Sequence, residues 1–242
     1  MQMTMRGQPA YQVIKRRIIQ ALSEGVYPAG SVLPAEKVLA SEFGVSIGTL
    51  RKAVDELVAD GILIRQQGRG TFVAQHDTDR LLYYFFHIVR HDGRKVTPKV
   101  QLVSFKTAKA SRDQAGKLRL TVGDKIFQVT NLLSLDGEPV LMDVISIEAA
   151  RFKGLTQQQF AGRPSSIYNL YQTGFDQTVV KASERLRATA ATPLQSELLH
   201  VPVGSPLLCI RRLALGFHDD PIEWRESFVC TERYEYFSEL TS

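Results

Sequence analysis

The hydrophobic positions of the first seventy-five residues recur three times at helical spacing and then change to a short alternating pattern. Apolar residues three and four positions apart share one helix face, so the periodic runs predict helices at residues 9–24, 35–42 and 47–60. Gly44 and Gly61 are suited to ending the second and third helices, and Ser46 is a good N-cap for the third. The alternating runs, 62–65 and 71–74, predict a two-stranded hairpin. The pattern therefore predicts a winged helix-turn-helix over residues 1–74.

The apolar stripes of the second and third helices identify the expected core of this domain. We expect it to contain Val38, Leu39 and Phe43 from the second helix, and Leu50, Ala53, Val54, Leu57 and Val58 from the third.

The pattern changes after a polar linker at residues 75–80, and residues 81–242 alternate between strand and helix signals. The predicted strands are 81–89, 100–107, 125–135, 140–147, 178–188, 207–216 and 222–230. The predicted helices are 111–120, 156–160, 165–172 and 193–199. An Asp-Gly turn at 136–137 joins two of the strands as a hairpin. The fold class is therefore α+β, with an antiparallel sheet in a second domain.

Composition excludes several classes of protein. The chain has 242 residues, 44% of them hydrophobic, and a formal net charge of +5. No apolar run approaches the ~20 residues that cross a membrane, and the N-terminus lacks the apolar core of a signal peptide. We therefore expect a soluble cytoplasmic protein with no membrane partner, in which Cys209 and Cys230 stay reduced.

Small and polar residues gather at the start of the third helix, where a recognition helix contacts base edges in the major groove. The candidate DNA-binding residues at this end are Ser46, Ile47, Gly48, Thr49, Arg51 and Lys52. The hairpin turn adds a cationic tip at Gly68, Arg69 and Gly70. The same layout occurs in protein-interaction domains, which is the alternative interpretation of the pattern.

Several motifs of this region resemble the DNA-binding domain of the GntR family of bacterial transcription regulators. They are Leu33-Pro34-Ala35-Glu36-Lys37, Phe43-Gly44-Val45-Ser46, Thr49-Leu50-Arg51 and Gln67-Gly68-Arg69-Gly70-Thr71-Phe72-Val73. The resemblance implies binding to double-stranded operator DNA. By position it makes Lys37 a backbone contact, Ser46, Thr49 and Arg51 recognition-helix contacts, and residues 68–70 the wing tip. Many relatives carry arginine where this chain has Ile47, so a common base contact is expected to be missing.

Two segments of the second domain share a layout that resembles the UTRA effector-binding domain of the HutC-type GntR regulators. Each has a Val-Gly turn, a strand and an acidic turn: 122–124 with 136–140, and 203–206 with 220–223. The resemblance implies a fold like that of chorismate lyase, a small-molecule effector, a homodimer and, usually, repression.

The same resemblance supplies candidate effector-binding residues, namely Asp143, Ser166, Tyr168 and Glu223, with Arg225 as a cationic partner for the two carboxylates. Relatives that bind phosphorylated sugars carry two arginines where this chain has Asn131 and Leu133. Without these cations, the charge-assisted contacts that a phosphate needs are lost. We therefore expect an effector that is smaller or more apolar than a sugar phosphate.

An enzyme is the competing interpretation, because the fold relative is a lyase. The histidines are scattered, with neither metal-ligand spacing nor an acid–base motif, at positions His76, His87, His91, His200 and His218. We therefore predict no catalytic residue, no metal site and no cofactor. A DNA-binding architectural protein without an effector is a further alternative. The interpretation that best combines both domains is a transcriptional repressor controlled by a metabolite.

Overall fold

The computed structural model describes residues 9–75, 86–163 and 166–239. The chain divides into two compact units, Met1–Gln75 and His76–Ser242, which are treated separately below. The expected tail at residues 1–8, the linker residues 76–80 and the first part of the strand predicted at 81–89 lie outside the described residues. None of the described helices is long and apolar enough to cross a membrane.

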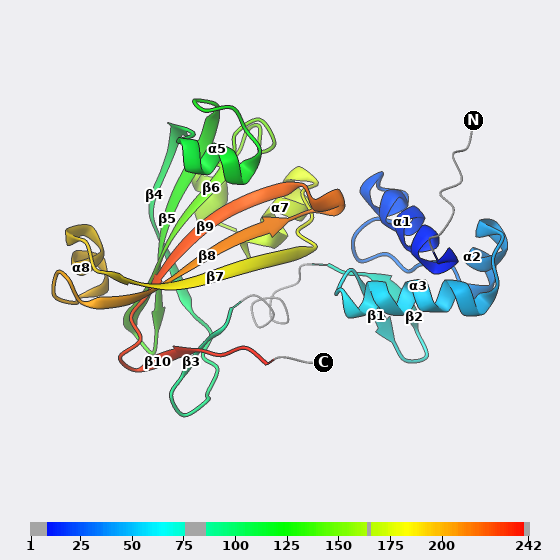
Figure 1. The fold of residues 1–242 in the computed structure, drawn as a ribbon, viewed down its shortest axis with the longest axis horizontal. Coiled ribbons are helices and arrows are strands. Elements are labelled where there is room, and N and C mark those ends of the chain that lie inside the picture. The colour runs from blue at the N-terminus through cyan, green and yellow to red at the C-terminus, as the bar shows by residue number, and fades with distance from the viewer. Residues whose placement is uncertain (1–8, 76–85, 164–165, 240–242) are drawn as a thin grey trace. The chain divides into compact units, whose positions relative to one another are not determined.

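The N-terminal unit contains three helices and one hairpin (Figure 1). Its elements are α1 (Ala10–Ser23), α2 (Glu36–Phe43), α3 (Ile47–Ala59), β1 (Leu63–Gln66) and β2 (Gly70–Val73). The two strands pair antiparallel, and an isolated bridge joins Val32 to Phe72 at the outer edge of β2. The winged helix-turn-helix predicted from the sequence is therefore confirmed.

The core of this unit lies between α1 and α3. Its fully buried side chains include Ile14, Ile18, Leu39, Leu50, Ala53, Val54, Leu57 and Leu63. Lys15 on α1 also binds Glu56 on α3 and Asp60 at the C-terminal cap of α3, at 2.9 and 2.7 Å. The prediction that Val38 belongs to the core is wrong: 48% of it is exposed, because α2 buries Leu39 and Ala40 instead.

The turn between α2 and α3 has the geometry predicted from its residues. Gly44 ends α2 in the left-handed region, at φ 67°, where a glycine carries no steric penalty. The Ser46 hydroxyl oxygen accepts a hydrogen bond from the Thr49 backbone N–H at 3.1 Å. These two caps fix the direction in which α3 leaves the turn.

The C-terminal unit is built on a six-stranded antiparallel sheet in the order β4-β5-β6-β9-β8-β7 (Figure 1). The bounds are β4 (Lys99–Lys109), β5 (Lys125–Leu135), β6 (Glu138–Glu148), β7 (Lys181–Ala190), β8 (Pro206–Leu215) and β9 (Pro221–Val229). A separate two-stranded pair consists of β3 (Ile88–Arg90) and β10 (Tyr234–Tyr236). The predicted fold class is confirmed, although the sequence pattern did not predict β10 and placed the start of β7 three residues early.

Helices cover both faces of the large sheet. Their bounds are α5 (Arg112–Leu118), α6 (Gln157–Ala161), α7 (Ile167–Phe175) and α8 (Pro193–Leu199). On one face, α5 packs on Ile126 and Trp224, and α8 packs on Met142 and Leu207. On the other face, α6 and α7 pack on Val129 and Ile145.

The pair β3 and β10 packs further along the face that carries α6 and α7. Ile88 and Tyr234 contact Leu133, Leu141 and Val229 there. That face therefore has two apolar clusters, one below α6 and α7 and one below β3 and β10. The polar residues described next lie along the same face.

Candidate DNA surface and effector pocket

The N-terminal end of α3 is exposed, as a recognition helix requires. Ile47, its first residue, is 42% exposed, Gly48 beside it is also exposed, and Thr49 is half-buried. This is the position at which the expected arginine is replaced by an aliphatic side chain. An exposed isoleucine here can contact a thymine methyl group, but it cannot hydrogen-bond to guanine.

The wing turn presents Arg69 between two glycines with positive φ. Gly68 has φ +73° and Gly70 has φ +114°. A Cβ on Gly70 would lie 3.2 Å from the Val32 side chain, so the close approach to Val32 also favours glycine there. The Arg69 guanidinium lies 5.8 Å from the centre of the Phe72 ring. The turn therefore exposes a cation on a compact tip.

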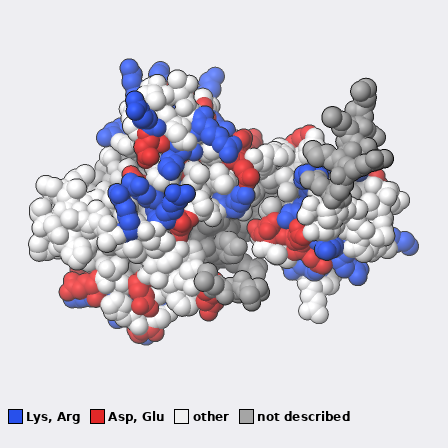
Figure 2. Space-filling model, in the orientation of Figure 1, with Lys and Arg blue, Asp and Glu red and all other residues white. Residues whose placement is uncertain are grey.

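The other expected cations of this surface differ in how they are partnered. Arg51 Nε lies 3.0 Å from Glu36, and Lys52 Nζ lies 4.3 Å from the centre of the Tyr11 ring. Lys37 and Arg69 make no ion pair with any described residue. On the face seen in Figure 2, acidic and basic side chains stand close together over this unit. The surface is therefore mixed in charge, and not uniformly basic.

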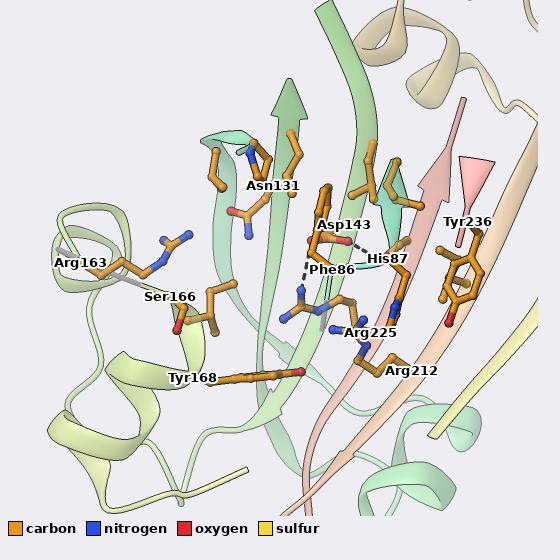
Figure 3. Close-up of a pocket in the computed structure, with 18 residues that line it drawn as sticks. Phe86, His87, Asn131, Asp143, Arg163, Ser166, Tyr168, Arg212, Arg225 and Tyr236 are labelled. Carbon is orange, nitrogen blue, oxygen red and sulfur yellow. Dashed lines mark hydrogen bonds and ion pairs between the residues drawn. The ribbon is translucent and has the colours of Figure 1, made fainter. Parts of the chain in front are cut away.

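A cavity of about 140 Å³ lies in the C-terminal unit. Its lining includes Asp143, Ser166, Tyr168 and Arg225, four of the five residues expected to meet an effector (Figure 3). The expected fifth, Glu223, is not part of the lining. Its side chain is completely buried below Tyr168 and Tyr171 of α7, where it also binds Arg225.

Strand register explains why these residues meet. Asn131 on β5 pairs with Asp143 on β6, Asp143 pairs with Ser227 on β9, and Ser227 pairs with Ile210 on β8. Residues directly opposite in neighbouring strands project on the same side of a sheet. The four therefore form one row across the floor of the cavity.

Glu223 is the centre of a buried ion and hydrogen-bond network. Arg225 donates to it at 2.8 Å, Tyr171 at 2.8 Å and Tyr168 at 3.3 Å. Burial, reinforced by Glu223, raises the pKa of Tyr168 to about 12, so its phenol stays protonated. Burial acts to lower the pKa of Arg225, but Glu223 and Asp143 outweigh it and raise that pKa above its usual value. The network holds Arg225 in one place with its charge already compensated.

A second ion pair lies beside the first. Arg212 binds Glu184 at 2.6 Å, and the Tyr236 hydroxyl donates to the same carboxylate. Figure 3 shows Arg212, His87 and Tyr236 together on one side of the pocket. Sequence reasoning missed this ion pair and the tyrosine that supports it, because Glu184, Arg212 and Tyr236 come from β7, β8 and β10 and no motif links them.

Asp143 is less fully compensated. It accepts a short hydrogen bond from the Ser227 hydroxyl, while its contact to Arg225 is long, at 3.4 Å. Burial raises the pKa of Asp143, and Arg225 and Ser227 offset this only in part.

Two further polar side chains of the lining, Asn131 and Arg163, lack a hydrogen-bond partner and an ion-pair partner, respectively, among the described residues. Asn131 is completely buried, and neither its amide nitrogen nor its amide oxygen has a hydrogen-bond partner within the described part of the chain. Arg163 has no carboxylate within ion-pair distance among those residues and donates only to the Phe160 carbonyl. Asn131 had been identified as a departure from relatives, whereas nothing in the sequence distinguished Arg163.

The described residues contain no group of histidine, cysteine or acidic side chains that could hold a metal ion. The two thiols, Cys209 and Cys230, are free.

Comparison with known proteins assigns both units. Residues 10–73 match the family model "Bacterial regulatory proteins, gntR family", and residues 93–235, more than half of the chain, match the UTRA domain. The "Probable fructoselysine utilization operon transcriptional repressor" of Escherichia coli K12 is 30% identical over 92% of this chain and 91% of its own length. The "Histidine utilization repressor" of Pseudomonas putida is 29% identical over 84% of this chain and 81% of its own length.

Solved structures agree with this assignment. A ligand-binding domain from Bordetella bronchiseptica, classed with GntR-family transcriptional regulators, superposes with a TM-score of 0.64 at 26% identity, covering 68% of this chain and all of that one. PhnF from Mycobacterium smegmatis shares the fold over 94% of this chain and 99% of its own, with a TM-score of 0.55 at 21% identity. The chain belongs to the GntR family of bacterial transcription regulators, with a UTRA effector-binding domain, and is not an enzyme.

Proposed function

We propose that this regulator is a homodimeric repressor that releases its operator when a metabolite occupies the cavity beside α7. The observation that carries the proposal is that cavity: it lies in the UTRA unit, mixes apolar walls with a few convergent polar groups, and leaves Asn131 unpartnered. A ligand that binds one DNA-binding state better than the other shifts the protein toward that state, and effector and operator affinities are then reciprocally coupled.

The DNA contacts in this proposal come from two places on the N-terminal unit. The recognition residues at the start of α3 are Ser46, Ile47, Gly48, Thr49, Arg51 and Lys52. Lys37 and the wing residues Gly68, Arg69 and Gly70 contact the phosphate backbone. Exposure of Ile47 and Arg69 supports both assignments. A homodimer would place two such DNA-binding units on two half-sites, which predicts a palindromic operator. We expect the protein to act in the cytoplasm.

The proposed effector contacts are Asp143, Ser166, Tyr168 and Arg225, with Glu223 supporting Arg225. The lining of the pocket includes Asn131 and Leu133. Of its arginines, Arg212 and Arg225 already have carboxylate partners. This supports an effector other than a sugar phosphate. The names of two relatives refer to fructoselysine and histidine utilization, so compounds of these kinds belong in the first set of test ligands.

The test is operator selection from random DNA, followed by fluorescence anisotropy on the selected site with and without metabolites. We expect a palindromic site bound by two chains, and at least one metabolite that weakens binding. Failure to select any sequence would contradict the regulator as proposed. A selected site whose affinity no metabolite changes would support the architectural alternative.

A further inference from the structure

The charges around the cavity balance only when Arg163 is included. Arg212 and Arg225 face the carboxylates of Glu184, Glu223 and Asp143, which leaves one negative charge in excess. Arg163 supplies the compensating positive charge, but it forms no ion pair with Asp143. The cavity is thus close to neutral as a whole. Arg163 has no ion pair with a described carboxylate, and Asp143 has only a long one.

Those two groups lie on different walls of the cavity. Asp143 is on the sheet, whereas Arg163 follows α6 in the chain and reaches toward the side of the pocket that holds Asn131 and Ser166 (Figure 3). Asp143 and Arg225 are both close enough to act on the pKa of Arg163, which burial lowers. Arg163 is partly buried, and its guanidinium lies 4.8 Å from the centre of the Phe160 ring. A partly buried guanidinium without an anion is costly, and a ligand carboxylate would reduce that cost.

The first turn of α7 adds a second feature suited to an anion. Ser166, Ile167 and Tyr168 all line the cavity, and α7 spans nine residues. The free N–H groups and the dipole of a helix N-terminus attract negative charge. Arg163 and this turn together form one anion-binding wall.

The floor of the cavity, on the sheet, is selective through Asn131 and Asp143, at paired positions of β5 and β6. The Asn131 amide offers an oxygen acceptor and a nitrogen donor that are both unpartnered among the described residues, and the Asp143 carboxylate beside it is an acceptor. A buried acceptor without a donor costs free energy, so this floor favours a ligand that donates hydrogen bonds.

The size of the cavity restricts the ligand further. Its volume of about 140 Å³ is close to the ~150 Å³ engineered cavity that takes benzene. One ring or one short branched chain therefore fits beside the apolar walls formed by Ile88, Val100, Leu133, Leu141 and Ile210.

We propose that the effector is a small zwitterion, an amino acid or close analogue, whose carboxylate binds Arg163 and the first turn of α7 and whose ammonium binds Asp143 and the Asn131 carbonyl. Such a ligand adds no net charge to a neutral cavity. A phosphate dianion would bring two charges to a wall with one uncommitted cation. The inference rests on the effector-controlled repressor proposed above and specifies the chemistry of its ligand.

The test uses the full chain and matched ligand triplets. Each of the twenty standard amino acids is compared with the amine that lacks its carboxylate and the acid that lacks its amino group, for example phenylalanine, phenethylamine and 3-phenylpropanoate. Glucosamine 6-phosphate is included as a sugar phosphate. A ligand that binds only the folded state raises the melting temperature, and calorimetry then gives its affinity. We expect at least one amino acid to bind at least tenfold more tightly than its amine and its acid.

Two substitutions that remove charge separate the two ends of the ligand. Arg163→Gln should lower the affinity for the amino acid and for the acid at least tenfold and leave the affinity for the amine unchanged. Asp143→Asn should lower the affinity for the amino acid and for the amine and leave the affinity for the acid unchanged. Matched controls are Arg112→Gln and Asp113→Asn, at the exposed start of α5 on the opposite face of the sheet, which should change neither.

The zwitterion assignment is overturned if no amino acid binds, if the acid or amine alone binds as tightly, or if glucosamine 6-phosphate is the tightest ligand. In each of these cases a different metabolite that releases the operator would leave the repressor function intact. Loss of operator binding itself, in the absence of any ligand, would instead contradict the proposed function.

Discussion

Arginine–carboxylate pairs occur in both units, but they differ in how much water reaches them. In the N-terminal unit the side chains of Arg51 and Glu36 are 59% and 27% exposed, whereas those of Arg225 and Glu223 in the pocket are 13% and 0% exposed. Solvent weakens an exposed pair and makes it easy to exchange, while a buried pair cannot lose one partner without leaving a charge in low dielectric. The same two residue types therefore serve an exchangeable DNA surface and a fixed binding site.

The difference also affects what each charge can do for a partner. Arg51 can leave Glu36 for a phosphate at small cost, because water screens both groups in either arrangement. Arg225 is held by Glu223 and Asp143, so its charge is already compensated before an effector binds. Within the pocket, the arginine available to a ligand is Arg163, because no described carboxylate binds it.

The largest effect is expected from removing one partner of the buried network. Glu223→Gln leaves Arg225 with only its long contact to Asp143 and should lower the free energy of unfolding by about 3–5 kcal/mol. Glu226→Gln, three residues along β9, breaks a half-exposed pair with Arg211 and should cost about 1 kcal/mol or less. Urea unfolding of the two variants measures the difference, and equal losses would refute the contrast drawn between buried and exposed pairs.

The next largest effect is expected at the wing. Arg69→Ala removes an exposed phosphate contact and should weaken operator binding about tenfold, or ~1.4 kcal/mol, with little change in stability. The slope of log affinity against log salt should fall by about one. Fluorescence anisotropy at several salt concentrations measures both. Arg94→Ala, an exposed arginine of the C-terminal unit, is the control and should leave the slope unchanged.

A smaller effect is expected from Glu36→Gln, which frees Arg51 and leaves Arg65 paired with Asp55 alone. Because both pairs are exposed, we expect the free energy of unfolding to change by less than about 1 kcal/mol. Affinity for unrelated DNA should rise more than affinity for the operator, since a carboxylate that competes with phosphate is lost. Parallel titrations on selected and random DNA measure this ratio. A drop in stability as large as that of Glu223→Gln would show that exposure does not separate the two units.

The smallest effect is a pH dependence of effector affinity. Burial raises the pKa of Asp143 above 3.8, and an ammonium bound beside it would lower that pKa again. The complex then holds fewer protons than the free protein, so affinity should rise as pH increases through the titration of Asp143 and level off above it. Calorimetry between pH 5 and 7 tests the sign, and Asp143→Asn should remove the slope. An affinity that falls with increasing pH would contradict the ammonium contact.

The sequence by itself determined the elements whose signals are local. The periodic stripe of α3, the cap at Ser46 and the glycine stop at Gly44 specify a helix-turn-helix without reference to the rest of the chain. Strands β5 and β6 were equally clear, because their alternation and the Asp-Gly turn between them are local. Motif resemblance added Asp143, Ser166 and Tyr168, which lie at the pocket, and Glu223, which lies outside its lining.

Only the tertiary structure decided which charges are buried, paired or left over. Glu223 and Asp143 are both carboxylates in the sequence, but strand register places Asp143 on the cavity floor, whereas Glu223 lies outside the lining and binds Tyr168 and Tyr171. Glu184 carries no local signal, since its partners Arg212 and Tyr236 come from other strands. Arg163 carries none either, because only the fold brings its side chain to the cavity. Burial and pairing are properties of packed neighbours, so the chemistry of the pocket depended on contacts that no local pattern encodes.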